Sequence, residues 1–115
     1  MTHFMNLQPE PFELISNGTK TIELRLLDEK RKNIAVSDIL IFKKKNDESN
    51  TISCTVKKLH VFNTFEELYR SLPLEKCGYL PHQVKNASAK DMEIYYSKET
   101  QKRYGVVGIE IELIK

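Results

Sequence analysis

The sequence predicts an α+β protein, a small mixed β-barrel with two or three short helices. Three observations carry this prediction. Residues 21–26 alternate polar and apolar side chains, residues 39–61 have the pattern of two paired strands, and residues 107–113 alternate again near the end of the chain. Helical patterns stand between the second and third of these regions. Strands that come first, helices inserted late and a closing strand are typical of the α+β class.

The length and composition are those of one globular domain. The chain has 115 residues, of which 40% are hydrophobic and 30% charged, which is enough apolar material for one compact core. We therefore expect a single domain over residues 1–115. The net charge is only +2, from 18 Lys and Arg against 16 Asp and Glu. This balance excludes a histone-like or polybasic mode of binding, so any nucleic-acid affinity must come from local arrangement.

Cysteine usage and the N-terminal segment indicate a cytoplasmic protein. Cys54 and Cys77 form no CxxC motif and no Cys/His cluster, so neither a disulfide framework nor a metal site is expected. Residues 1–11 have no basic stretch followed by an apolar one. The longest clearly apolar run, residues 39–42, is far below the ~20 residues of a membrane-spanning helix. We expect no cofactor and no membrane association.

The first quarter of the chain predicts a helix followed by a strand. Two prolines and an apolar stripe predict a short helix over residues 9–16, and Gly18 is a suitable left-handed terminator. In the following TIELRL, apolar and polar side chains take opposite faces of a strand. The apolar face consists of Ile22, Leu24 and Leu26, and the polar face of Thr21, Glu23 and Arg25. This alternation predicts a half-buried strand with one polar face.

The middle of the chain predicts a hairpin with a bulge. Residues 27–38 are too charged to bury, whereas the β-branched and aromatic run at residues 39–42 is typical of a strand. The segment NDESN, residues 46–50, is typical of a turn. On the return arm the apolar positions change parity across Lys57 and Lys58. A β-bulge there would produce this change and would curve the sheet toward a barrel.

Helical patterns fill most of the second half. A capping-box spacing at Thr64–Glu67 predicts a two-turn helix that Pro73 stops. The same spacing at Ser88–Asp91 predicts another helix over residues 89–98. Between the two, residues 74–87 are expected to be irregular.

One cluster of polar residues is a candidate site. Lys20, Glu23 and Arg25 follow Gly18 at the junction between the expected helix and strand, where functional residues are often found. Strand parity puts Glu23 and Arg25 on one face, ~6.6 Å apart along the strand. Lys20 could reach over that face from a turn whose backbone Gly18 leaves free. The alternative, which composition alone favours, is a solvated face on which Glu23 and Arg25 only neutralise each other.

The spacing G-x-K-x-x-E-x-R, from Gly18 to Arg25, resembles the signature of the ASCH domain family. Members of that family have a PUA-like β-barrel fold, in which this motif lines a cleft beside the barrel. The resemblance extends over nearly the whole chain and implies a strand ahead of the helix at residues 9–16. The late segment EIYYSKETQKRYGVVGIEI is similar to one bacterial subgroup of the family. Where the family usually carries Gly-Asp at a turn, this chain has Ser37-Asp38, so the turn must form without glycine.

The resemblance implies two functions, both of which put a nucleobase in the cleft. ASCH and PUA-like domains are linked to RNA binding, and Lys20, Thr21, Glu23 and Arg25 would then contact RNA or a modified nucleoside. A small bacterial branch of similar size instead hydrolyses 4-acetylcytidine with a lysine, a threonine three residues later and a distant glutamate. Lys20 matches that lysine, Glu23 stands in place of the threonine, and no residue in 77–86 matches the glutamate.

Both functions have a chemical rationale, and base or RNA recognition is the one we favour. If the chain is an enzyme, Lys20 and Glu23 would be catalytic and Arg25 could supply a donor to the oxyanion. For recognition alone, Lys20 and Arg25 could donate to carbonyl or phosphate oxygens, and Glu23 could accept from an exocyclic amine. A third alternative is a protein-interaction module whose polar strand face is only a surface for a protein partner.

Other basic and aromatic side chains are weaker candidates. Five lysines would converge if the hairpin pairs as expected, giving either a phosphate-binding rim or an edge that opposes sheet association; they are Lys43, Lys44, Lys45, Lys57 and Lys58. Three tyrosines could stack on bases but are more often core residues; they are Tyr95, Tyr96 and Tyr104. The isolated histidines, at positions 3, 60 and 82, are expected to be structural or exposed.

Overall fold

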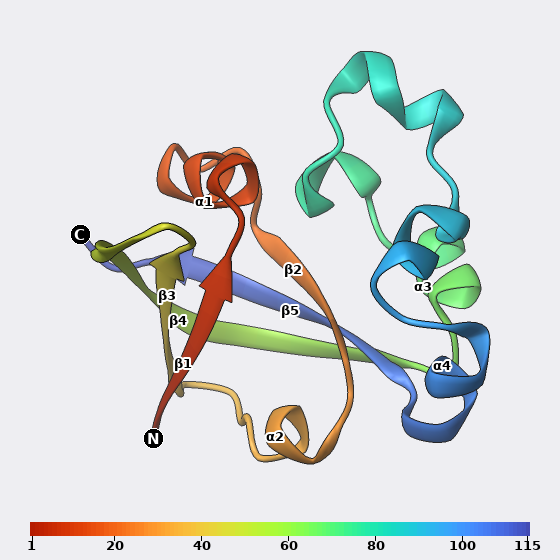
Figure 1. The fold of residues 1–115 in the computed structure, drawn as a ribbon, viewed down its shortest axis with the longest axis horizontal. Helices are drawn as coiled ribbons and strands as arrows, with labels where there is room; N and C mark the ends of the chain where they lie inside the picture. Colours follow the sequence, from red (N-terminus) through yellow and green to blue (C-terminus); the bar gives the residue numbers. More distant parts are fainter.

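Five strands form one curled, mixed sheet in the computed structural model, which describes residues 1–115 (Figure 1). The strands are β1 (Thr2–Leu7), β2 (Ile22–Leu26), β3 (Ile39–Lys44), β4 (Asp47–Phe62) and β5 (Val106–Leu113). Their order is β1-β3-β4-β5-β2. β1 and β3 run parallel, and all other neighbours run antiparallel. The sheet is a half-barrel, which confirms the predicted α+β class.

The helices are short, and most of them follow β4. α1 (Pro9–Ser16) and α2 (Glu29–Lys32) lie between strands in the N-terminal half. Between β4 and β5 the chain forms α3 (Phe65–Ser71), the 3₁₀ helices η1 (Leu74–Cys77), η2 (Pro81–Asn86) and η3 (Ala89–Ile94), and α4 (Lys98–Tyr104). This green-to-blue segment lies on the β2 side of the molecule, away from β1 and β3 (Figure 1). None of the helices combines the length and the apolar character needed to cross a membrane.

Two hydrophobic clusters hold these parts together. The larger fills the concave side of the half-barrel beneath α1 and includes Leu40, Phe42 and Ile109. The smaller joins the apolar face of β2 to Phe65 and Leu68 of α3. β2 is therefore covered on its apolar face by α3, and its other face is on the concave side of the sheet. Glu23 is buried and Arg25 is only partly exposed, so the alternative interpretation, a solvated polar face on β2, is wrong.

The two end strands of the sheet, β1 and β2, are joined by side chains. No backbone ladder connects them. Instead Arg25 of β2 donates to the Asn6 carbonyl at 2.9 Å, and Lys30 of the adjacent α2 donates to the Phe4 carbonyl at 2.9 Å. These bonds satisfy two backbone acceptors on the free edge of β1, where an unpaired strand exposes its carbonyls.

β4 contains the predicted bulge, which lies in its pairing with β5, and the hairpin turn before β4 differs from the prediction. Val56 pairs with Ile111 and Lys58 pairs with Glu110, so Lys57 is the extra residue. The turn is tighter than expected, because β4 already begins at Asp47 and Asn46 takes a positive φ of 69°. Asn tolerates this conformation better than most residues.

The predicted helices are confirmed in part. α1 has the predicted bounds, and the Thr64 hydroxyl caps α3 by accepting from the Glu67 amide at 3.3 Å. The Ser88–Asp91 capping box is present, but it starts a 3₁₀ helix that ends at Ile94 rather than a helix to residue 98. A separate helix, α4, begins after Ser97, whose hydroxyl accepts from the Thr100 amide. Neither α2 nor α4 was predicted. The structure therefore has four α-helices, where two or three short helices were expected.

The turn before β3 forms without glycine, as the Ser37-Asp38 pair requires. Ser37 takes a φ of 79°, a conformation that costs a residue with a Cβ about 1–2 kcal/mol. Asp38 offsets this cost through its carboxylate, which accepts from the Ala35 amide at 2.9 Å and from His3 at 2.8 Å. The N-terminal amine lies 3.2 Å from the same carboxylate. The Asp38 carboxylate thus ties the turn to Ala35 within it and to the N-terminal residues Met1 and His3.

Candidate functional site

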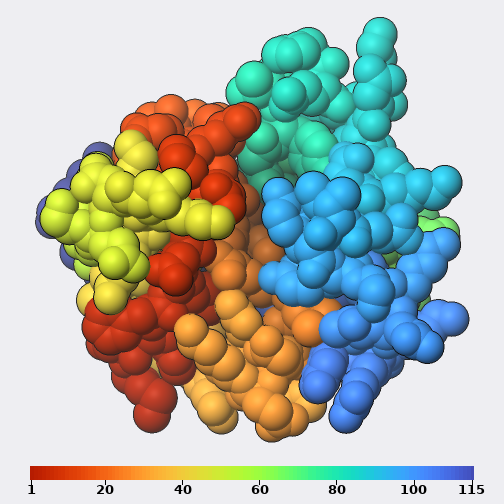
Figure 2. Space-filling model, viewed as in Figure 1, coloured from red at the N-terminus to blue at the C-terminus, as the bar shows by residue number.

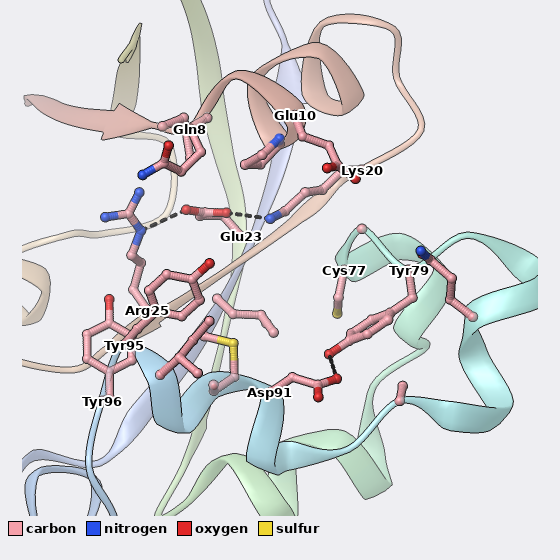
Figure 3. A pocket seen from close by; sticks show the side chains of 18 of the residues that line it. Gln8, Glu10, Lys20, Glu23, Arg25, Cys77, Tyr79, Asp91, Tyr95 and Tyr96 are labelled. Atoms are coloured by element: carbon pink, nitrogen blue, oxygen red, sulfur yellow. Dashed lines mark hydrogen bonds and ion pairs between the residues drawn. The ribbon is translucent and has the colours of Figure 1, made fainter. Parts of the chain in front are cut away.

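Lys20, Glu23 and Arg25 form one line of charges, with Glu23 in the middle (Figure 3). Lys20 Nζ lies 2.7 Å from Glu23 Oε1, and Arg25 Nε lies 2.7 Å from Glu23 Oε2. The expectation that these three charged ends cluster, with Lys20 approaching from the turn, is confirmed. Each oxygen of Glu23 is paired with a different cation, and the cluster carries a net charge of +1.

Strand pairing explains why this cluster is buried. Glu23 pairs with Ile109 and Arg25 with Val107 of β5, and both partners belong to the cluster that fills the half-barrel. Paired residues project from the same face of a sheet, so Glu23 and Arg25 lie on the concave side, next to the open seam between β1 and β2. Only 4% of Glu23 is exposed.

Burial and pairing act against each other on the ionisation of Glu23. Burial disfavours the carboxylate, but the neighbouring charges and hydrogen bonds of Lys20 and Arg25 together hold the pKa of Glu23 below its usual range. For Arg25, burial lowers the pKa, and the attraction of the Glu23 carboxylate outweighs it and raises the pKa. Glu23 is therefore a carboxylate at neutral pH that fixes two cations in place.

The turn before β2 brings Lys20 over this face. Gly18 takes a φ of 83° after the end of α1, and the Lys20 amide donates to the Leu14 carbonyl at 2.9 Å. The Thr21 amide donates to the Lys76 carbonyl at 2.9 Å, which ties the start of β2 to η1. The side chain of Lys20 then passes over Gly78, where a Cβ atom would stand 3.2 Å from Lys20 Cδ.

A cleft of about 1430 Å³ opens above the cluster. Figure 2 shows it as a groove between the red and yellow N-terminal half and the cyan and blue segment, with orange β2 at its floor. One wall comes from residues 6–11 and from the β3–β4 turn at residues 45–48, and the other comes from residues 77–96. The cleft therefore separates the half-barrel from the late helical segment, and Lys20, Glu23 and Arg25 lie where the two meet.

Two adjacent tyrosines form part of the wall beside Arg25 (Figure 3). Tyr96 stacks on buried Phe65 with ring centres 5.9 Å apart, and its hydroxyl contributes to the raised pKa of Arg25. Tyr95 is 63% exposed. The expectation that the late tyrosines are core residues is therefore wrong for Tyr95. Tyr96 and Tyr104 do pack against the smaller cluster.

A hydrogen-bonded chain of Tyr69, Tyr79 and Asp91 lines another part of the cleft. The Tyr79 hydroxyl donates to Asp91 at 2.6 Å and lies 2.7 Å from the Tyr69 hydroxyl. Burial and the bond to Asp91 raise the pKa of Tyr79, and burial raises the pKa of Tyr69 to about 12. Asp91 also accepts from the Ser88 amide at 3.2 Å as part of the capping box. These hydrogen bonds connect Asp91 of η3 to Tyr69 of α3 through Tyr79, the residue that follows Gly78.

Several predicted residues lie away from the cleft or from one another. Thr21 lines a separate hollow of about 340 Å³ with Lys57. Of the five lysines, those at 43–45 are at the turn end of the hairpin, whereas Lys57 and Lys58 lie beyond the opposite end of β3, so the five do not converge. Lys44 is paired with Glu13 at 2.8 Å, and Lys45 alone of the five lines the cleft.

Gly78, Tyr79 and Asp91 are site residues that the sequence did not single out. Their signals were present but weak, because Gly78 follows a cysteine in a segment without periodicity and Asp91 served only as a capping residue. Cys77 also lines the cleft, and burial raises the pKa of its thiol to about 11. No group of three or more His, Cys, Asp or Glu side chains is arranged to hold a metal ion.

A curled half-barrel with this motif in a cleft at its seam defines a PUA-like α+β domain. The ASCH domain model matches residues 5–115, and the chain belongs to the ASCH domain family. The resemblance in the motif is thereby confirmed over nearly the whole chain.

Two solved structures of small archaeal proteins are similar to this chain. The crystal structure of hypothetical protein PH0355 is 37% identical, with a TM-score of 0.82, over 99% of this chain and 100% of that one. The solution structure of PF0455 from Pyrococcus furiosus is 34% identical, with a TM-score of 0.71, over 100% and 99% of the two chains. No curated protein matches. The bacterial subgroup remains a prediction.

Proposed function

We propose that the cleft binds a nucleobase of RNA or of a modified nucleoside, with Lys20 and Arg25 as its contacting groups. The observation that carries this proposal is that Glu23 fixes both cations at the floor of a ligand-sized cleft. Fixed donors in a partly buried site are suited to carbonyl and ring-nitrogen acceptors. ASCH domains are generally RNA-binding, and this general property of the family supports the proposal.

The charges around the cleft favour contact with a base over contact with a long phosphate backbone. Its cationic side chains are Lys20, Arg25 and Lys45, and its carboxylates are Glu10, Glu23, Glu48 and Asp91. A groove that follows a phosphate backbone needs an excess of cations. We therefore expect binding to weaken with salt at a log-log slope of only about −1 to −3, which corresponds to a few phosphate contacts.

The ion pair also favours recognition over hydrolysis of 4-acetylcytidine. Hydrolysis by Lys20 would need a free lone pair on Nζ, but Nζ is held as a donor to Glu23 at 2.7 Å. The hydroxyl of the hydrolase branch is replaced by that same carboxylate. We expect the wild-type protein to leave 4-acetylcytidine intact and Glu23→Thr, which releases Lys20 and supplies a hydroxyl, to turn it over slowly. Turnover by the wild-type protein that Glu23→Gln abolishes would instead support an enzyme.

The binding test uses two matched pairs of variants. Arg25→Ala and Lys20→Ala remove cleft cations, whereas Arg70→Ala and Lys32→Ala remove the same charges from exposed positions outside the cleft. Fluorescence anisotropy with labelled single-stranded and hairpin RNA at low salt should show about a tenfold loss for the cleft variants. The two surface variants should stay within about twofold of the wild-type protein, because a single surface charge contributes little.

Folding is checked by thermal unfolding of each variant before binding is compared. Equal losses for the cleft and surface variants would mean that RNA binds elsewhere by charge alone. A folded protein that binds neither RNA nor nucleosides at low salt would overturn the proposal and leave a protein-interaction module as the better account.

A further inference from the structure

We infer that the cleft selects a carbonyl-bearing base, guanine, uracil or cytosine, and discriminates against adenine by stacking the base on Tyr95 with its acceptor edge toward Arg25. This inference rests on the proposed function and names the chemistry of the ligand. It depends on two features, the burial and pairing of Glu23 and the exposure of Tyr95.

The first feature is that the charged cluster can donate hydrogen bonds to a ligand but offers it no accessible acceptor, because Glu23 is buried as well as paired. Both oxygens of Glu23 are paired with cations at 2.7 Å, and only 4% of the residue is exposed. The expectation that Glu23 accepts from an exocyclic amine is therefore not supported by the geometry. Lys20 has three N–H groups and Arg25 has five, of which the contacts with Glu23 and Asn6 occupy three in total. The remaining N–H groups are available to a ligand.

The second feature is an exposed aromatic ring beside those donors. Tyr95 is 63% exposed and its neighbour Ile94 is 79% exposed, although both line the cleft. Tyr96, by contrast, is held against Phe65, so the two tyrosines differ in what covers them. Large side chains that remain exposed in a concave site are typical of binding surfaces, and an exposed tyrosine offers a face on which a planar base can stack.

The two features together restrict the base. Figure 3 places the tyrosine pair next to Arg25 at one end of the Lys20, Glu23 and Arg25 line. A base stacked on Tyr95 would present its edge to guanidinium donors, which match adjacent acceptors such as O6 and N7 of guanine or O2 and N3 of cytosine. Uracil offers carbonyl oxygens. The N6 amine of adenine is a donor, and directed at the cluster it would meet another donor.

Carboxylates elsewhere in the cleft do not remove this restriction. Glu10, Glu48 and Asp91 line other parts of the wall, and Asp91 is already bonded to Tyr79 and to the Ser88 amide. An amine at the far end of a ligand could reach one of them. The edge that faces Arg25 still has to be an acceptor.

The experiment compares the four nucleoside 5′-monophosphates on the whole protein, with binding followed by amide chemical shifts in NMR spectra. The phosphate and ribose are common to all four, so differences report the base. We expect GMP, UMP and CMP to shift the amides of residues 20–25 and 94–96 and to bind about tenfold more tightly than AMP. A mixed-sequence single-stranded RNA tests the proposed function, RNA binding, separately from base preference.

Two substitutions at one exposed position separate stacking from folding. Tyr95→Phe keeps the ring and should keep the affinity within about twofold, whereas Tyr95→Leu removes it and should lose about tenfold. RNA binding without base preference, or with Tyr95→Leu unchanged, would overturn the inference and leave the proposed function standing. Tighter binding of AMP would overturn it as well. If neither the nucleotides nor the RNA bind, both the inference and the proposed function fail.

Discussion

The side chain of Lys20 lies directly across Gly78, a residue 58 positions later in the chain. A Cβ on Gly78 would be 3.2 Å from Lys20 Cδ and 3.7 Å from Nζ. Lys20 can thus reach Glu23 only because the facing wall of the cleft has no side chain at this point. The contact also means that the 3₁₀ segment and the start of β2 determine together where the lysine ammonium lies.

The first prediction follows from this contact and concerns Gly78→Ala. Gly78 has a φ of 109° and Gly18 a φ of 83°, so alanine should destabilise the protein by about 1–2 kcal/mol at either position. Only Gly78→Ala should also displace Lys20 and lower RNA affinity, because a Cβ on Gly18 would meet no atom within 4 Å. Urea unfolding and RNA binding of the two variants provide the measurement. Equal affinities would show that the position of Lys20 is unimportant for binding.

The second prediction concerns the buried carboxylate. Glu23→Gln leaves Lys20 and Arg25 close together without their shared anion, and removing one partner of a buried ion pair costs about 3–5 kcal/mol. The pKa of Glu23 is held below its usual range in the folded protein, so its stabilising contribution is complete above the ordinary value of about 4.3 and declines as the pH falls below it.

Urea unfolding at neutral and acidic pH checks both parts of this prediction. The wild-type protein and Glu23→Gln should differ most near neutral pH, and the difference should narrow in acid. A constant difference between pH 7 and pH 3 would contradict the role assigned to the charge. Glu66→Gln, at an exposed pair on α3, is the control and should change stability by less than about 1 kcal/mol.

The third prediction concerns acid sensitivity at the turn before β3. The bond from His3 and the bond from the Ala35 amide lower the pKa of Asp38 to about 2. Because this pKa is below the ordinary value of about 3.9, the carboxylate stabilises the fold above pH 4, and the contribution is lost as the pH falls toward 2. Asp38→Asn should therefore lower the melting temperature at pH 7 and flatten its dependence on pH between 4 and 2, as measured by circular dichroism. A parallel pH dependence in the two proteins would contradict this assignment.

The fourth prediction concerns the conformation of Ser37. Glycine adopts a φ of 79° without the steric cost that serine has. It also makes the unfolded chain more flexible, which offsets part of this gain in stability. Ser37→Gly should thus stabilise the protein by about 0.5–1 kcal/mol in urea unfolding. Asn46→Gly, at a φ of 69°, should gain less, because asparagine already tolerates this region. A loss of stability in Ser37→Gly would mean that the serine side chain stabilises the turn.

Local patterns predicted the elements whose signals lie within a few residues. The alternation of Ile22, Leu24 and Leu26 gave β2, the Thr64–Glu67 capping box gave α3, and the parity change at Lys57 gave the bulge. The shared face of Glu23 and Arg25 also followed from strand parity, and Lys20 was expected to reach that face from the turn at Gly18. In each case the required information is carried by neighbouring residues.

The burial of the site depends on partners far away in the chain. Glu23 is enclosed because Ile109 lies opposite it on β5 and because η1 lies beside Lys20, and neither contact has a local signal. The capping box at Ser88 marks a helix start but does not distinguish an α-helix from a 3₁₀ helix. Lysine positions along the hairpin were known, but the register that separates Lys43 from Lys57 was not.

The side-chain closure of the seam has a consequence for how this protein can be altered. Arg25 covers a carbonyl on the free edge of β1, and uncovered strand edges promote pairing between molecules. Substitution of Arg25 is therefore expected to weaken recognition and, as a separate effect, to promote aggregation. A selection for well-expressed variants would retain arginine at this position even if the cleft had lost its ligand, so its retention in a redesigned protein is weak evidence that binding has been kept.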